Sequence, residues 1–101
     1  MTTTVHTYES CGTYSDPCVM QYRANNLTDL LRHVRIAMED RVDSIAIFRD
    51  GNMIGAWDQE SDAEPDGEGG MDRIFCGYER VKPDSYYWNC LLTLFPNDGR
   101  T

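Results

Sequence analysis

A hairpin signal at residues 44–57 constrains the fold more than any other feature of this sequence. Asp50-Gly51 separates two runs of mainly apolar side chains. Asp-Gly suits the tight turn whose two central residues both have positive φ, and this turn joins antiparallel strands. A two-residue loop also fixes the register of the strands. It predicts three opposed pairs: Phe48 with Met53, Ile47 with Ile54, and Ala46 with Gly55.

The spacing of apolar residues predicts one amphipathic helix over residues 27–42. Asn25 and Asn26 can cap its first free amides, and Asp29 lies in the first turn, where the helix dipole favours an anion. Apolar side chains three and four residues apart share one helix face. The predicted core-facing stripe comprises Leu27, Leu30, Leu31, Val34, Met38 and Val42. Ile36 lies on the opposite side, and we expect it at the surface.

Further segments rich in β-branched or alternating apolar residues predict strands at 2–9, 18–24 and 73–81. Segment 86–95 is apolar almost throughout, so it is either a buried strand or a short core helix, and its aromatic residues favour the strand. The order β-β-α-β-β-β-β predicts a single α+β domain over residues 1–101, in which one helix covers an antiparallel sheet. A parallel nucleotide-binding fold is excluded, because it needs alternating strands and helices.

Alternation with a period of two predicts the faces of the strand at 73–81. On this pattern Ile74, Cys76 and Tyr78 share one face, and Phe75, Gly77 and Glu79 share the other.

The negative charge is concentrated in one segment. Seventeen acidic and nine basic residues give the chain a formal charge of −8. Seven of the acids lie between Asp58 and Asp72, where there is no Lys or Arg, which leaves ten acids and nine bases elsewhere. Pro65 and three glycines in the same segment predict an acidic loop over residues 58–72. Because such a polyanion repels phosphates, direct binding to nucleic acid is disfavoured.

The simplest interpretation of this segment is a solvated loop, but the spacing of its acids also suggests a function. They occupy successive even positions: Asp58, Glu60, Asp62, Glu64, Asp66 and Glu68. An extended backbone would place them along one side, about 6.6 Å apart. That spacing is comparable to the charge spacing of a nucleic-acid strand, about 3.4 Å of helix axis before the winding path is added. Such a row would fit a channel lined by Lys and Arg.

Metal binding is an alternative function for the same segment. Asp62, Glu64 and Asp66 match the first, third and fifth positions of a calcium loop, but the twelfth position is Arg73, where a bidentate acid is required. The four cysteines lack the close pairing of structural zinc sites, and without a signal peptide we expect them to be reduced and mostly buried. They are Cys11, Cys18, Cys76 and Cys90. No metal or cofactor is therefore predicted.

No pattern of catalytic residues is found. His6 lies near Ser10 and Cys11, but no flanking motif supports a nucleophile and base, so we expect no enzyme. The first twenty residues have no basic segment of a signal peptide, and no stretch approaches the ~18 apolar residues of a membrane span, so we expect a cytoplasmic protein. Tyrosine is frequent at interfaces, and we expect Tyr14, Tyr86 and Tyr87 at a partner-binding surface.

The small size, the acidity and the segment from Asp58 to Asp72 together make the chain similar to small phage-encoded inhibitors, including anti-CRISPR proteins and other nucleic-acid mimics. No motif is shared, so no residue role is transferred. The resemblance implies binding to a protein partner with a basic nucleic-acid-binding surface. The expected contacts are Asp58, Glu60, Asp62, Glu64, Asp66, Glu68, Asp72 and the three tyrosines. An oligomeric phage accessory protein is a further alternative, with the oligomeric state left open.

Overall fold

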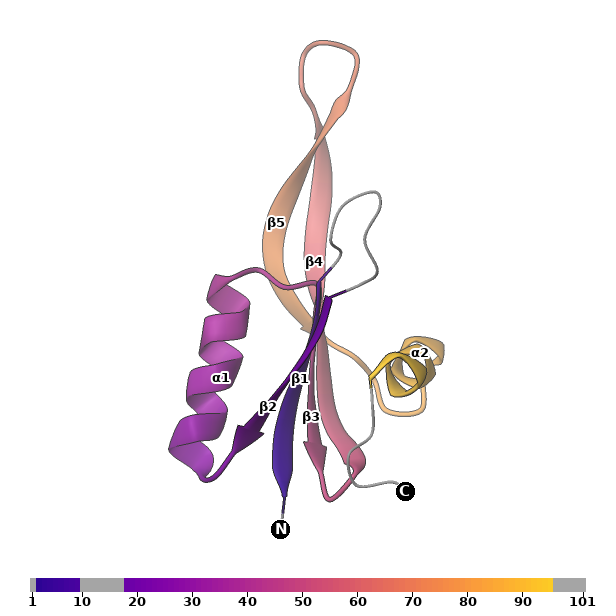
Figure 1. The fold of residues 1–101 in the computed structure, drawn as a ribbon. Coiled ribbons are helices and arrows are strands. Elements are labelled where there is room, and N and C mark those ends of the chain that lie inside the picture. Colours follow the sequence, from indigo (N-terminus) through magenta and orange to yellow (C-terminus); the bar gives the residue numbers. More distant parts are fainter. Residues whose placement is uncertain (1, 10–17, 96–101) are drawn as a thin grey trace.

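The computed structural model describes residues 2–9 and 18–95 (Figure 1). Within these residues the chain forms five strands and two helices, which confirms the predicted α+β class. The elements are β1 (Thr3–Glu9), β2 (Cys18–Ala24), α1 (Leu27–Glu39), β3 (Ser44–Arg49), β4 (Asn52–Pro65), β5 (Met71–Arg80) and α2 (Tyr86–Leu94). Residues 10–17, which include Cys11 and Tyr14, and residues 96–101 lie outside the described residues.

All five strands form one antiparallel sheet with the order β2-β1-β3-β4-β5. The two helices lie on opposite faces of this sheet (Figure 1). On the α1 side, Val5, Ala37, Val42 and Ile45 form a small buried cluster. On the α2 side, a larger cluster comprises Ala46, Phe48, Met53, Ala56, Val81, Trp88, Leu91 and Phe95. The central strand β3 contributes to both clusters, which explains why five of its six residues are buried.

The Asp-Gly turn between β3 and β4 forms as predicted. Asp50 and Gly51 have φ of 51° and 83°, the positive values that this turn requires. Phe48 pairs with Met53 as expected, but the next predicted pairs are wrong, because Ile47 pairs with Gly55 and Ala46 with Ala56. The extra residue is Ile54, which forms a β-bulge.

Helix α1 begins where predicted and ends earlier. Asn26 accepts a hydrogen bond from the Asp29 amide at 2.9 Å, so it is the N-cap. The helix ends at Glu39 rather than at residue 42. Arg41 has φ of 55°, and its amide and that of Val42 donate to the carbonyls of Met38 and Ala37. These two bonds form a Schellman cap, in which a residue with positive φ ends the helix and the next apolar residue packs back onto it.

The predicted apolar stripe of α1 is only partly buried. Leu30, Val34 and Met38 pack against the cluster that contains Ala37 and Val42. Leu27 and Leu31 are 68% and 58% exposed, so their predicted place in the core is wrong. The physical reason is that α1 packs mainly on β1 and β2, leaving its side toward β4 and β5 without a covering element. Ile36 is exposed, as expected.

Segment 86–95 forms helix α2, so the predicted sixth strand and the prediction of a single helix are both wrong. Ser85 caps the helix, with its hydroxyl accepting from the Trp88 amide at 3.2 Å. Trp88, Leu91 and Phe95 recur at intervals of three and four residues and are buried against the sheet. Helical spacing therefore places the apolar residues of this segment against the larger cluster.

The predicted acidic loop at residues 58–72 is largely strand. β4 extends to Pro65 and pairs with β5 from Met71, so only residues 66–70 form the turn between them. The hairpin extends well beyond both helices, and the molecule measures 52 × 27 × 27 Å along its principal axes (Figure 1). The acidic segment is thus the free arm of the domain.

Candidate functional site

The turn at the free end of the β4–β5 hairpin is built by one carboxylate. Asp66 Oδ1 accepts hydrogen bonds from the Glu68 amide at 2.7 Å and the Gly70 amide at 3.0 Å. These bonds lower the pKa of Asp66, because they stabilise its charged form. Gly67 and Gly69 take positive φ of 85° and 90° in the same turn. Asp66 therefore shapes the turn, in addition to carrying charge.

Six carboxylates lie on one face of the hairpin, which we call the acidic face. β4 has no extra residue after Gly55, so Asp58, Glu60, Asp62 and Glu64 point to the same side by the period of two. On β5, Asp72 lies opposite Glu64 and Glu79 lies opposite Asp58, so both join this side. The acidic face comprises Asp58, Glu60, Asp62, Glu64, Asp72 and Glu79.

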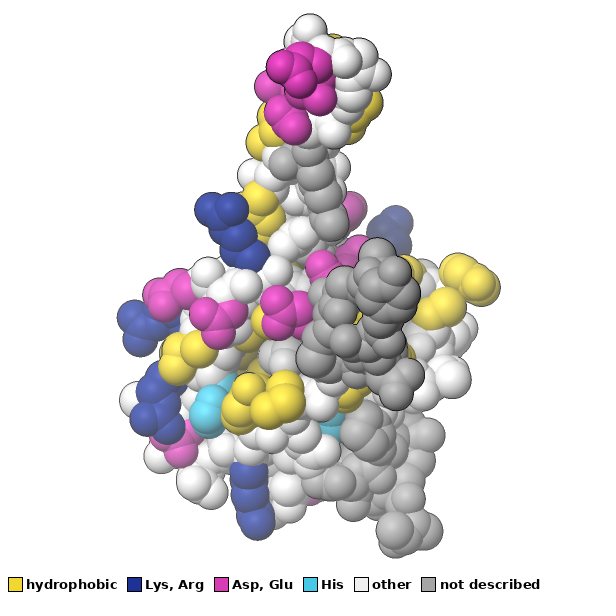
Figure 2. All heavy atoms as spheres, turned by 45° about the horizontal axis from the view of Figure 1, so that its top comes forward, with side chains coloured by type: hydrophobic (Ala, Val, Ile, Leu, Met, Phe, Trp, Pro, Cys, Tyr) yellow, Lys and Arg dark blue, Asp and Glu magenta, His cyan; other side chains and the backbone are white. Residues whose placement is uncertain are grey.

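The acidic face opposes the stability of the hairpin that carries it. Two of its cross-strand pairs, Glu64–Asp72 and Asp58–Glu79, oppose acid to acid, and like charges directly opposite one another destabilise a sheet. Among the described side chains, no Lys or Arg forms an ion pair with these carboxylates. Figure 2 shows Asp and Glu side chains at the free end of the hairpin, while the Lys and Arg side chains drawn in blue lie nearer the body of the domain.

Asp58 differs from the other members because it is anchored at the base of the hairpin. Its Oδ1 accepts hydrogen bonds from Tyr87 Oη at 2.9 Å and from Ser44 Oγ at 3.0 Å. Ser44 is fully buried, and burial together with the Asp58 carboxylate raises the pKa of Tyr87. Asp58 thus connects the arm to β3 and α2, and Tyr87, although 39% exposed, contributes a hydrogen bond to this junction.

The opposite face of the hairpin base is held by the segment that follows α1. Tyr78 Oη donates to the Val42 carbonyl at 2.5 Å, and the pKa of Tyr78 is raised to about 12, chiefly by burial. The backbone amide of Gln59 donates to the Asp43 carbonyl at 2.8 Å, and the side-chain Nε2 of Gln59 donates to the Arg41 carbonyl at 3.0 Å. These bonds fix the direction in which the arm leaves the domain.

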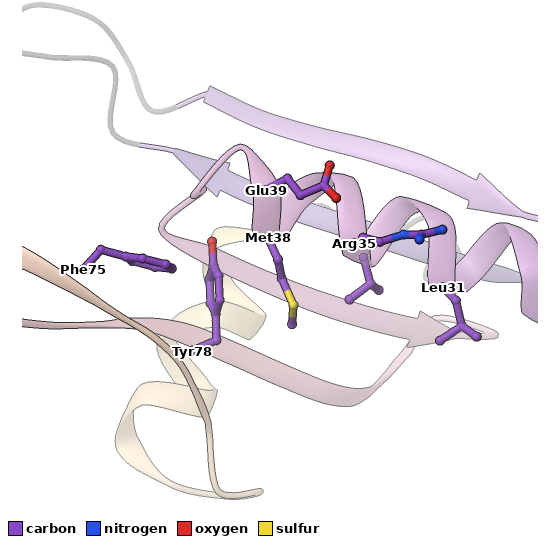
Figure 3. Close-up of a pocket in the computed structure, with 7 residues that line it drawn as sticks. Leu31, Arg35, Met38, Glu39, Phe75 and Tyr78 are labelled. Carbon is purple, nitrogen blue, oxygen red and sulfur yellow. The ribbon is translucent and has the colours of Figure 1, made fainter.

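A groove of about 650 Å³ runs between this face and α1. Figure 3 shows Met38 on the helix beside Tyr78 on β5, with Phe75 beyond Tyr78 and Leu31 at the other end of the groove. The Arg41 guanidinium lies 4.6 Å from the centre of the Phe75 ring, a distance at which a cation and an aromatic ring attract. The hairpin therefore has the acidic face on one side and this groove, lined mainly by apolar side chains, on the other.

The other predicted site residues do not form a single surface. Tyr86 is 86% exposed, but it lies on α2, away from the free end of the arm. Glu68 is exposed in the turn. Cys76 and Cys90 are free and exposed, so their predicted burial is wrong. Within the described residues, no three His, Cys, Asp or Glu side chains are arranged to hold a metal ion.

Sequence reasoning missed Glu79 as a member of the acidic face. The predicted faces of β5 fail at a bulge, where Glu60 pairs with Gly77 and Ser61 with Phe75. The bulge brings Phe75 and Tyr78 to one side, contrary to the prediction, and their rings lie 5.8 Å apart. The signal in the sequence is Gly77, whose φ of 106° strongly favours glycine.

Comparison with protein-family models, with curated proteins and with solved structures finds no match to this chain. In the described part of the chain, neither helix has the length and apolar character needed to cross a bilayer.

Proposed function

We propose that this protein is a small inhibitor that binds the basic nucleic-acid-binding surface of a protein complex, of the CRISPR type, and blocks it. The acidic arm mimics the charge pattern of a nucleic-acid strand and occupies the channel in its place. The protein needs no catalytic chemistry for this activity, because exclusion of the nucleic acid is sufficient.

The acidic face is the observation that supports this proposal. A sheet gains no stability from opposing Glu64 to Asp72, so stability does not account for the pattern. A partner rich in Lys and Arg would neutralise both charges and convert the repulsion into binding energy. The same field would attract such a partner over a distance and speed the encounter at low salt.

The dimensions of the arm also fit a channel. Carboxylates alternate along β4 about 6.6 Å apart, and the β5 row lies about 4.8 Å away across the ladder. Both rows are held on a hydrogen-bonded hairpin that is anchored at its base through Asp58 and Tyr78. A pre-ordered arm loses less conformational entropy on binding than a flexible loop would.

The test is a pull-down from host lysate with two variants of equal charge. The first, E60Q/D62N/E64Q/D72N, removes four charges from the acidic face and leaves the structural Asp58 intact. The control, E39Q/D40N/D50N/D84N, removes four exposed charges that lie outside the arm. We expect wild type and control to capture a nucleic-acid-binding complex at low salt, to release it at high salt, and to be displaced by its nucleic acid.

The acidic-face variant should lose this capture. If it retains the partner as well as the control does, the acidic face is not the binding surface, and the proposed function is wrong.

A further inference from the structure

The two edges of the sheet differ in how they are protected against pairing with another strand. An edge strand exposes a row of unpaired amides and carbonyls, and proteins protect such edges with bulges, charges, lysines or prolines. The edge strand β5 has the bulge at Gly77 and carries the acidic residues Asp72 and Glu79. β2 is seven residues long, pairs with β1 without a bulge, and has no lysine or proline. Its sequence, CVMQYRA, contains one charge, Arg23.

Beside the β2 edge lies a small apolar patch on the α1 side. Met20, Tyr22 and Ile36 are 51%, 37% and 47% exposed. Tyr22 stacks on His33 with ring centres 5.2 Å apart, and both line a pocket of about 230 Å³ together with Ile36. Met20 lies two residues from Tyr22 on the same face of β2.

From these features we infer that β2 pairs with β2 of a second copy, antiparallel, around a two-fold axis at Gln21. The register places Met20 opposite the partner's Tyr22, and Val19 opposite the partner's Arg23. No two like charges are opposed. Each Met20 then lies beside the partner's Tyr22 ring, a contact that sulfur and aromatic groups favour. The inference is independent of the proposed function.

The charge distribution selects β2 over β5 as the edge that pairs. Two copies of a chain with charge −8 repel one another most where their acidic arms approach. Four strand spacings, about 19 Å, separate β2 from β5. That distance exceeds the screening length of about 8 Å at physiological salt. Pairing through β2 therefore keeps the acidic arms apart and leaves both of them free.

Sedimentation of the whole chain over a concentration series tests the inference. We expect wild type to form a species of twice the 11.6 kDa chain mass. M20K places a lysine at the edge and should weaken association about tenfold or more. I54K, which adds a lysine at an equally exposed apolar residue on β4, should leave association unchanged.

The double variant M20K/Y22E tests the register itself, because a lysine and a glutamate then lie opposite one another twice across the two-fold axis. It should restore the dimer relative to M20K. Far-UV circular dichroism checks that each variant is folded. A wild type that stays monomeric up to about 1 mM overturns the inference, and so does a dimer that M20K and I54K affect equally. In the pull-down, M20K should behave as wild type, so the two proposals fail separately.

Discussion

Removing the Glu64 carboxylate should make the end of the hairpin more stable. Glu64 lies opposite Asp72 and two residues from Asp62 on the same face. With carboxylates about 6 Å and 7 Å apart in water, Coulomb's law gives repulsions of about 0.7 and 0.6 kcal/mol. Screening with a Debye length of about 8 Å reduces their sum to about 0.6 kcal/mol. E64Q should therefore stabilise the ladder by about that amount.

Amide hydrogen exchange measures this effect where it occurs, because the end of a hairpin opens without global unfolding. Amides of β4 and β5 near Glu64 should exchange about threefold more slowly in E64Q at 0.15 M salt, and the gain should nearly vanish at 1 M salt. D72N should give a smaller gain of the same sign, and the double variant should gain less than the sum. Faster exchange in E64Q, or a gain that salt does not change, would refute the view that the acidic face is held at a cost in stability.

Substitutions at three further positions test the packing and hydrogen bonding below the arm. Arg41 has positive φ at the helix end, so R41G should be about 1 kcal/mol more stable than R41A in urea unfolding, because both lose the guanidinium and only glycine accepts that backbone without strain. Folding raises the pKa of Tyr78 to about 12, so its contribution to stability is complete below pH 10, the unfolded value, and declines between there and pH 12. In a melting series Y78F should flatten this decline, and it should cost about 1 kcal/mol at pH 7 through the lost bond to Val42. G55A would place a Cβ 3.0 Å from the Trp57 ring, so it should shift Trp57 fluorescence and destabilise by about 1 kcal/mol.

The parts of the fold that sequence predicted correctly are those set by local chemistry. The Asp50-Gly51 turn and the Asn26 cap each depend on a few neighbouring residues, and both form as expected. Leu27 and Leu31 show the limit of this reasoning. Their helical spacing predicts a shared face, but burial depends on whether a strand lies beneath that face, and α1 packs mainly on β1 and β2 rather than toward β4 and β5.

The composition of the acidic segment predicts a loop because Asp, Glu, Gly and Pro are all depleted in strands, and this prediction is wrong for most of the segment. β4 is nevertheless a strand there because β5 supplies a partner for every residue from Trp57 to Pro65. The even spacing of the acids predicts a row on an extended backbone, which is confirmed for the four from Asp58 to Glu64, whereas Asp66 and Glu68 lie in the turn. Membership of the row depends on pairing, so Glu79, twenty-one residues from Asp58, could be placed on the acidic face only from the register.

The bulge at Gly77 explains how one hairpin carries two different faces. Without the extra residue, strict alternation along β5 would place Tyr78 with Asp72 on the acidic face and turn Glu79 toward α1. The bulge reverses the alternation after Cys76, so Tyr78 reaches the Val42 carbonyl while Glu79 lies opposite Asp58. The Tyr78 contact that anchors the arm and the place of Glu79 on the acidic face therefore depend on the same backbone feature. A hairpin that only completed the sheet would need neither the contact between Tyr78 and Val42 nor a row of carboxylates. This is a reason to regard the arm as the functional element of this domain.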